Sequence, residues 1–114
     1  MKVALDTNVL VSAFATRGLC ADIFNLVLAE HELILGVTVL AESQRVLREK
    51  MRVPAETTRE LMAFLRREAV VAGGAEVLVT GDQDLLAVAG QSPIQILTPR
   101  GLWVQLTAAA RRSR

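Results

Sequence analysis

Three carboxylates in this chain have the type and placement that cation chemistry requires. Asp6 follows the apolar run Lys2–Leu5. Asp82 comes shortly after a second run, Glu76–Thr80, and Glu42 lies near the start of an amphipathic segment. Carboxylates that converge repel one another, and a divalent cation relieves that repulsion while taking oxygen ligands. Because no His or Cys accompanies these acids, the donor set favours Mg²⁺ or Mn²⁺ over zinc.

Each acid also has an ordinary structural explanation. Asp6 and Asp82, placed after a strand and before a helix, are in the position of N-cap residues. Glu42, in the first turn of its predicted helix, would favour the helix dipole. Asp84 is expected to cap Leu85–Ala87 rather than to bind an ion. The convergence of the first three acids at one edge of a sheet is what favours a shared site.

The elements that must position these acids alternate between strand and helix patterns. Short Val, Leu and Ile runs predict strands at Lys2–Leu5, Leu33–Val37, Glu76–Thr80 and Ile94–Leu97. Helical spacing and stop signals predict helices over Val9–Phe14, capped by Thr7 or Asn8, and over Ala21–Ala29, Leu40–Met51, Ala55–Ala69, Asp84–Ala89 and a last segment after Pro99 anchored by Leu102, Trp103 and Leu106.

This alternation predicts an α/β fold with a parallel sheet covered by helices on both faces. In such folds ligands bind beyond the carboxyl ends of the strands. Asp6 and Asp82 therefore lie at the same rim, and Glu42 follows the second strand close to that rim.

Composition restricts the remaining possibilities. The chain has 114 residues, 52% of them hydrophobic, and a formal net charge of +1, so we expect one domain over 1–110 and a disordered basic tail over 111–114. The balanced charge does not by itself indicate nucleic acid. The single Cys20 excludes an internal disulfide and fits a reducing compartment. With no signal-peptide pattern and no membrane-span pattern, we expect a cytoplasmic protein.

Several segments together resemble the PIN domain family. The first is Val3-Ala4-Leu5-Asp6-Thr7-Asn8-Val9-Leu10-Val11-Ser12-Ala13, and a later one is Leu78-Val79-Thr80-Gly81-Asp82-Gln83-Asp84-Leu85-Leu86. Between them, Val39-Leu40-Ala41-Glu42-Ser43 followed by Arg45-Val46-Leu47 resembles the family helix that carries a catalytic Glu. The likeness covers nearly the whole chain in order and is greatest to the PIN subgroup of toxins from toxin–antitoxin pairs.

The resemblance implies a metal-dependent ribonuclease, a toxin whose partner is an antitoxin protein. Its fold would be a three-layer sandwich around a parallel sheet of four or five strands. Asp6, Glu42 and Asp82 match the catalytic metal-site acids, and the polar residues that orient them match Thr7, Asn8 and Thr80. In that mechanism a Mg²⁺ or Mn²⁺ ion activates a water that attacks the RNA phosphate. Arg45, one turn after Glu42 on the same face, is the best candidate for an RNA phosphate contact.

One departure from the family pattern is large. Such proteins carry an acid-rich stretch and a further active-site Asp just before the strand that matches Glu76–Thr80. Here no Asp lies between Asp22 and Asp82, so this segment is missing and the fold is shortened by one helix. Glu68 and Glu76 are poor replacements. We expect a weakened metal site, and a homodimer in which a second chain covers the exposed sheet surface.

Two other functions compete with a ribonuclease. A catalytically weakened or inactive PIN-like protein would act as a partner-binding module, which the missing acid favours. A phosphatase or phosphotransferase with Asp6 as nucleophile would need a second Asp two positions on, where this chain has Asn8. His31 and Cys20 are interpreted as a solvated side chain and a packing residue.

Overall fold

The computed structural model of the chain describes residues 1–71 and 74–112. Its strands are β1 (Lys2–Leu5), β2 (Glu32–Ile34), β3 (Val77–Val79) and β4 (Gln95–Leu97). Its helices are α1 (Thr7–Ala15), α2 (Leu19–Glu30), α3 (Val37–Glu49), α4 (Ala55–Glu68), α5 (Gln83–Ala87) and α6 (Pro99–Arg112), and a short 3-10 helix, η1, spans Ala89–Gln91.

The four strands form one parallel sheet in the order β2-β1-β3-β4. The central strand β1 pairs with β2 and β3, so the first strand of the chain lies between two strands that follow it. The predicted α/β class and four-stranded parallel sheet are confirmed. All carboxyl ends lie at one edge of the sheet, which is where Asp6 follows β1.

A trace of a fifth strand lies beside β2. Val70 forms an isolated parallel bridge with Ile34, in which the Val70 amide donates to the Leu33 carbonyl at 2.8 Å and the Leu35 amide donates to the Val70 carbonyl at 3.0 Å. Within residues 1–71 and 74–112 this is the one position that pairs beside β2 outside the four strands, two residues after α4 ends at Glu68.

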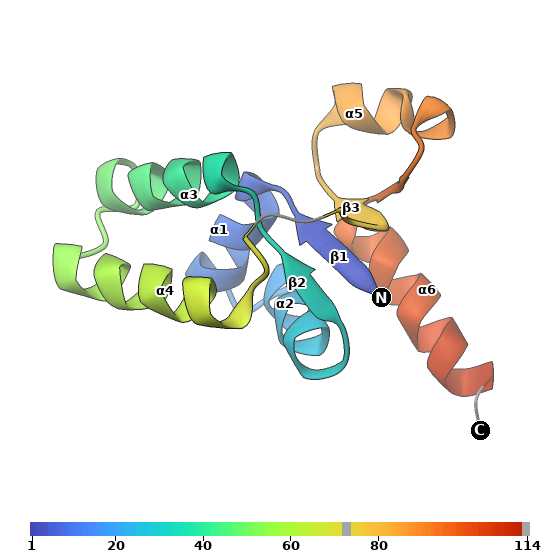
Figure 1. Ribbon diagram of the computed structural model, residues 1–114, viewed down its shortest axis with the longest axis horizontal. Helices are drawn as coiled ribbons and strands as arrows, with labels where there is room; N and C mark the ends of the chain where they lie inside the picture. Colours follow the sequence, from blue (N-terminus) through green and yellow to red (C-terminus); the bar gives the residue numbers. More distant parts are fainter. Residues whose placement is uncertain (72–73, 113–114) are drawn as a thin grey trace.

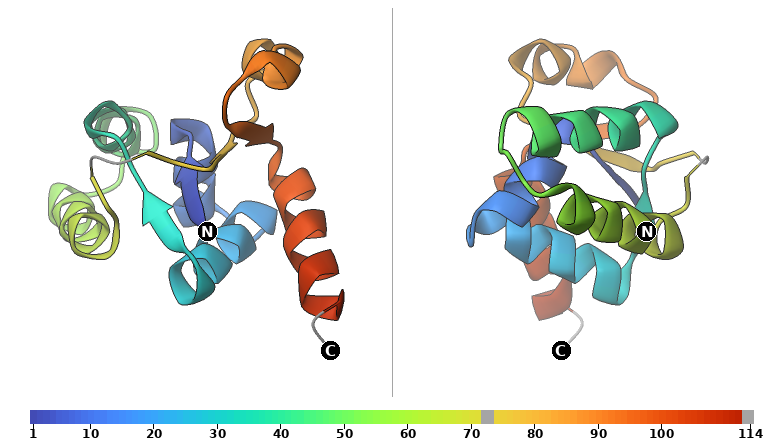
Figure 2. Two further views of the ribbon diagram at one scale, coloured as in Figure 1. Left: turned by 45° about the vertical axis from the view of Figure 1, so that its right-hand side comes forward. Right: turned by 90° about the vertical axis from the view of Figure 1, so that its left-hand side faces the viewer.

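The helices cover the two faces of the sheet unequally. In the view of Figure 1, α1, α2 and α6 lie behind the sheet, α3 and α4 lie beside β2, and α5 lies beyond the ends of β3 and β4. Figure 2 (right) shows α3 and α4 running in opposite directions as a pair in front of α1 and α2. On the covered face the side chains of Val3, Leu5, Val77 and Val79 are at most 1% exposed.

Several boundaries differ from the expected ones. Val37 begins α3 instead of ending a strand, because the chain turns at Gly36, the N-cap residue. The helix at the carboxyl end continues through Arg111 and Arg112, beyond the expected domain end at residue 110. Residues 113–114 of the basic tail lie outside the described residues.

Among the described residues no single helix is long and apolar enough to cross a membrane. Only together are α1 and α2 long and apolar enough, and the two helices are bent by 103° at their junction.

Two buried hydroxyls on neighbouring helices make a matched test of the packing. Ser43 on α3 is fully buried and its Oγ has no hydrogen-bond partner among the described residues, whereas Thr58 on α4 donates to the Pro54 carbonyl at 3.1 Å. Ser43→Ala should raise the free energy of unfolding by about 1 kcal/mol, because it removes an unpaired buried polar group and favours the helix. Thr58→Ala should lower it by about 1 kcal/mol or more. Urea denaturation of both variants checks this, and destabilisation by Ser43→Ala would contradict it.

Candidate functional site at the strand ends

The backbone first brings two strand ends together at the carboxyl edge of the sheet. The Asp6 amide donates to the Val79 carbonyl at 2.9 Å, and the Thr80 amide donates to the Leu97 carbonyl at 2.9 Å. These bonds continue the parallel ladder one residue past β1 and β3. As a result Asp6 and Thr80 lie side by side, although they are far apart in the sequence.

The Asp6 carboxylate is held by hydrogen bonds on both oxygens. The Thr7 amide donates to Oδ1 at 2.8 Å, and the Thr80 hydroxyl donates to Oδ2 at 2.8 Å. Asp6 is also the N-cap residue of α1. Each carboxylate oxygen can accept a second interaction, so Asp6 is fixed in orientation and still has lone pairs free for a ligand.

Glu42 reaches the same cluster from α3. The Thr7 hydroxyl donates to Glu42 Oε2 at 3.0 Å, a contact that the packing of α1 against α3 makes possible. The expected position of Glu42 in the first turn of its helix is wrong. Because α3 begins at Val37, Glu42 lies in the second turn. It is therefore too far from the N-terminus of the helix to interact favourably with the helix dipole.

Asp82 joins the cluster through its backbone. The Asp82 amide donates to the Thr80 hydroxyl oxygen at 3.0 Å, while its own carboxylate accepts from the Asp84 amide at 2.9 Å. Asp82 is therefore the N-cap of α5, and the expectation that Asp84 caps this helix is wrong. The N-cap residue differs from the predicted one because the helix begins at Gln83, one residue earlier than the sequence pattern indicates.

The resulting arrangement is a chain of contacts that runs Glu42, Thr7, Asp6, Thr80, Asp82. The two threonines are buried, at 6% and 0% exposure, and they lie beneath acids that are half-buried or exposed. The Thr80 hydroxyl has two partners, Asp6 and the Asp82 amide. Thr7 reaches its two partners with different groups, its hydroxyl to Glu42 and its amide to Asp6. Such shared buried partners hold their neighbours in one geometry. The structure thus links the three predicted acids and two of the three predicted orienting residues in one hydrogen-bond chain, in which Asp82 takes part through its backbone amide and not through its carboxylate.

The fit of this cluster to a divalent cation is good in chemistry and incomplete in geometry. Carboxylate oxygens are the ligands that Mg²⁺ and Mn²⁺ prefer. Within residues 1–71 and 74–112, however, no three His, Cys, Asp or Glu side chains stand close enough to enclose an ion. Mg²⁺ is commonly held by one or two carboxylates, with water and substrate phosphates completing its shell, and Asp6 with one neighbour provides that minimum.

The remaining candidates lie outside the hydrogen-bond chain. Asn8 and Arg45 are exposed, and neither takes part in a side-chain hydrogen bond among the described residues. Glu76 accepts from the Lys2 amide at 3.3 Å, at the amino end of the sheet and therefore away from the acid cluster. Glu68 is the last residue of α4.

His31 lies between α2 and the amino end of β2, at the other end of the sheet from Asp6 and Asp82, and its side chain is less solvated than expected. Its Nδ1 is buried without a partner in the described structure. Burial lowers the pKa of His31, as does the nearby N-terminal amine, and Glu30 opposes the shift. Burial raises the pKa of the Cys20 thiol, which fits a packing role.

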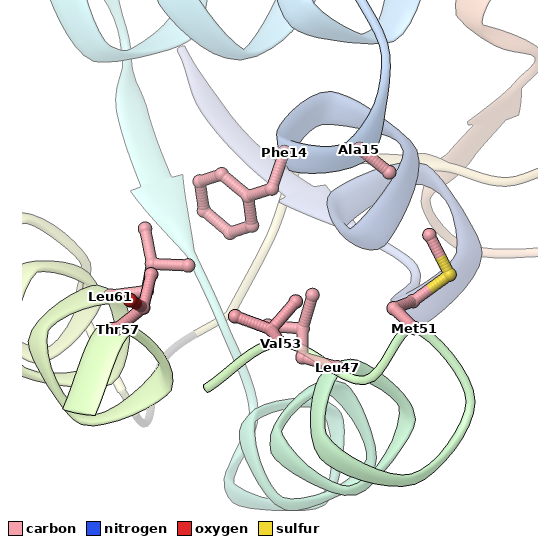
Figure 3. Close-up of a pocket in the computed structure, with 7 residues that line it drawn as sticks. All are labelled: Phe14, Ala15, Leu47, Met51, Val53, Thr57 and Leu61. Carbon is pink, nitrogen blue, oxygen red and sulfur yellow. The ribbon is translucent and has the colours of Figure 1, made fainter. Parts of the chain in front are cut away.

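An apolar pocket, which sequence reasoning missed, lies on another side of α1. Its volume is about 290 Å³ and it is lined by Phe14, Ala15, Leu47, Met51, Val53, Thr57 and Leu61. Figure 3 shows these side chains converging from the end of α1, the end of α3, the segment that connects α3 to α4, and the first half of α4. The acids lie at the opposite end of α1, so the pocket is separate from the acid cluster. Apolar positions at helical spacing are visible in the sequence, but their convergence depends on how three segments pack.

Comparison with known proteins gives no independent identification. The sequence matches no protein-family model and no curated protein.

Proposed function

We propose that this protein is a metal-dependent ribonuclease of the PIN type, with a weakened acidic site. The observation that supports the proposal is the hydrogen-bond chain that links Glu42, Asp6 and Asp82 through two buried threonines. A helix cap needs one acid with one amide. Coupling three acids across β1, α3 and β3 exceeds what capping requires, and it is typical of a site that positions carboxylates for a shared ligand.

In this proposal each residue has a defined task. Asp6 supplies the central ligand, because each of its carboxylate oxygens accepts one hydrogen bond that orients it and keeps a lone pair for the ion. Glu42 and Asp82, both exposed, flank it and complete the negative site. A bound Mg²⁺ or Mn²⁺ would supply polarisation of the RNA phosphate and a more acidic water. Arg45, on the surface of α3 one turn after Glu42, would contact a phosphate of the RNA.

The wider biological role rests on the resemblance to PIN toxins. On that basis the cell would hold this ribonuclease in check with an antitoxin protein, and both would act in the cytoplasm. A second copy of the chain covering the sheet face that the shortened fold leaves open would give a homodimer, and it is the alternative occupant of that face.

A second function, a partner-binding module without catalysis, is favoured by two observations. No three acids in the described residues stand close enough to enclose an ion, and the sequence lacks the further Asp that the family carries. Calorimetric measurement of Mn²⁺ binding separates the two functions.

Calorimetric titration of the EDTA-stripped protein with Mn²⁺ tests whether Asp6, Glu42 and Asp82 form a metal site. We expect binding at micromolar strength or better in the wild type and loss of binding in Asp6→Asn, because the substitution removes the central charge. Glu76→Gln is the matched control, since this acid lies at the other end of β3, and it should bind as the wild type does. Absence of binding in the wild type would reject the metal site and leave the partner-binding function.

The same Asp6→Asn variant should keep its fold in EDTA. Asn is as good an N-cap as Asp, its Oδ1 can still accept a hydrogen bond, and repulsion among the acids decreases. The melting temperature in EDTA should be unchanged or higher, and Asp82→Asn and Glu42→Gln should behave likewise. Lower melting temperatures for all three would show that the acids are structural and share no site.

Thr80 provides a test of positioning. Thr80→Val keeps the shape of this buried side chain but removes the donor to Asp6 and the acceptor for the Asp82 amide. We expect about 1–3 kcal/mol lower stability in urea and about 10–100-fold weaker Mn²⁺ binding. Thr80→Ser should restore Mn²⁺ affinity. If Thr80→Val destabilises the protein but leaves Mn²⁺ affinity unchanged, the hydroxyl has only a structural role.

A further inference from the structure

A row of apolar residues crosses the sheet on the face opposite to the packed core. Ala4 pairs with Ile34 on one side and with Leu78 on the other, and Leu78 pairs with Ile96. Paired residues of neighbouring parallel strands project from the same face, and successive residues project from opposite faces. Ile34 is buried at 5% exposure, but Ala4, Leu78 and Ile96 are each partly exposed. We name these three residues the open strip.

No helix covers the open strip in the part of the chain that the structure describes. Figure 1 shows the sheet in front, with α1, α2 and α6 behind it. On that covered face the neighbours of the strip, Val3 and Val77, are at most 1% exposed. Parallel sheets occur almost only with both faces covered, so the strip is a surface that this chain leaves without a layer.

Acidic residues border the open strip on both sides. One row toward the amino ends of the strands, the same face carries Glu32 and Glu76, with Lys2 between them. One row toward the carboxyl ends it carries Asp6, and Asp82 lies just beyond Thr80. Two copies of this face packed together would place several of these acids against one another, because Lys2 is the one basic residue among the five border residues named here. A partner with basic residues beside an apolar ridge matches both the charge and the apolarity.

The dimensions of the strip also select the occupant. Three strands spaced about 4.8 Å apart give a width of about 10 Å, which is the diameter of one α-helix. Strands of this length run for about 10–13 Å, or two to three helical turns. A stable dimer interface buries roughly 800 Å² on each partner, several times the area of this strip.

We propose that the open strip is a docking site for an amphipathic helix of a partner protein, one whose apolar ridge is flanked by Lys or Arg. The helix lies over Ala4, Leu78 and Ile96, and its basic residues face the two acidic borders. This docking site goes beyond the proposed ribonuclease function and does not require that Asp6 bind a metal.

A synthetic peptide of about 12 residues tests the site, with Leu at helical spacing along one face, Lys on both flanks and Ala elsewhere. Its fluorescence anisotropy is titrated with the full chain, and a scrambled peptide of the same composition is titrated in parallel. We expect the patterned peptide to bind at least tenfold more tightly than the scrambled one. Leu78→Gln and Ile96→Gln should each weaken it at least tenfold.

Val104→Gln is the matched control, because Val104 is 55% exposed on α6, behind the sheet. It should change the affinity less than twofold. Circular dichroism establishes that each variant is folded, and Ile96→Gln, on the edge strand, carries the test if Leu78→Gln does not fold.

Three results would each overturn the proposal. Equal binding of the two peptides would show that charge alone attracts them. Unchanged affinity in folded Leu78→Gln and Ile96→Gln would place the peptide elsewhere. Light scattering that shows a dimer of the free chain, dissociated by Leu78→Gln, would assign the strip to a second copy.

Discussion

The hydrogen bonds of Asp6 are the constraint on which the rest of this structure depends. Its amide extends the ladder between β1 and β3, and its carboxylate accepts from Thr7 at the start of α1 and from Thr80 after β3. One residue thus joins the central strand, the first helix and the neighbouring strand. The sheet edge and the acid cluster are therefore parts of one hydrogen-bonded unit, and neither could shift without breaking the other.

Much of this arrangement could be predicted from the sequence, because the relevant signals are local. Short Val and Leu runs followed by Asp or Thr-Gly-Asp indicate strands that end at a polar rim, and the alternation with helices requires a parallel sheet. These rules place Asp6 and Asp82 at one edge of the sheet. They also separate Glu76 from the site, since it precedes its strand instead of following it.

The parts that could not be predicted depend on contacts between distant segments. Val37 is β-branched and follows an apolar run, so its pattern favours a strand, yet the turn at Gly36 makes it the first residue of α3. The hydrogen bond from Thr7 to Glu42 requires α1 and α3 to pack together. The sequence of neither helix indicates that the other packs against it. The pocket beside Phe14 and the partly exposed open strip of the sheet also depend on contacts between distant segments.

The topology has a consequence for how the molecule is assembled. The first strand is central and pairs with β3, so the hydrogen bond between Asp6 and Thr80 spans 74 positions in the chain. Contacts of such long sequence separation slow folding, because a large loop must close before they form. During synthesis, β1 leaves the ribosome long before its partner exists. The acid cluster is consequently among the last features to form, and the nascent chain has no assembled site until most of it has been made.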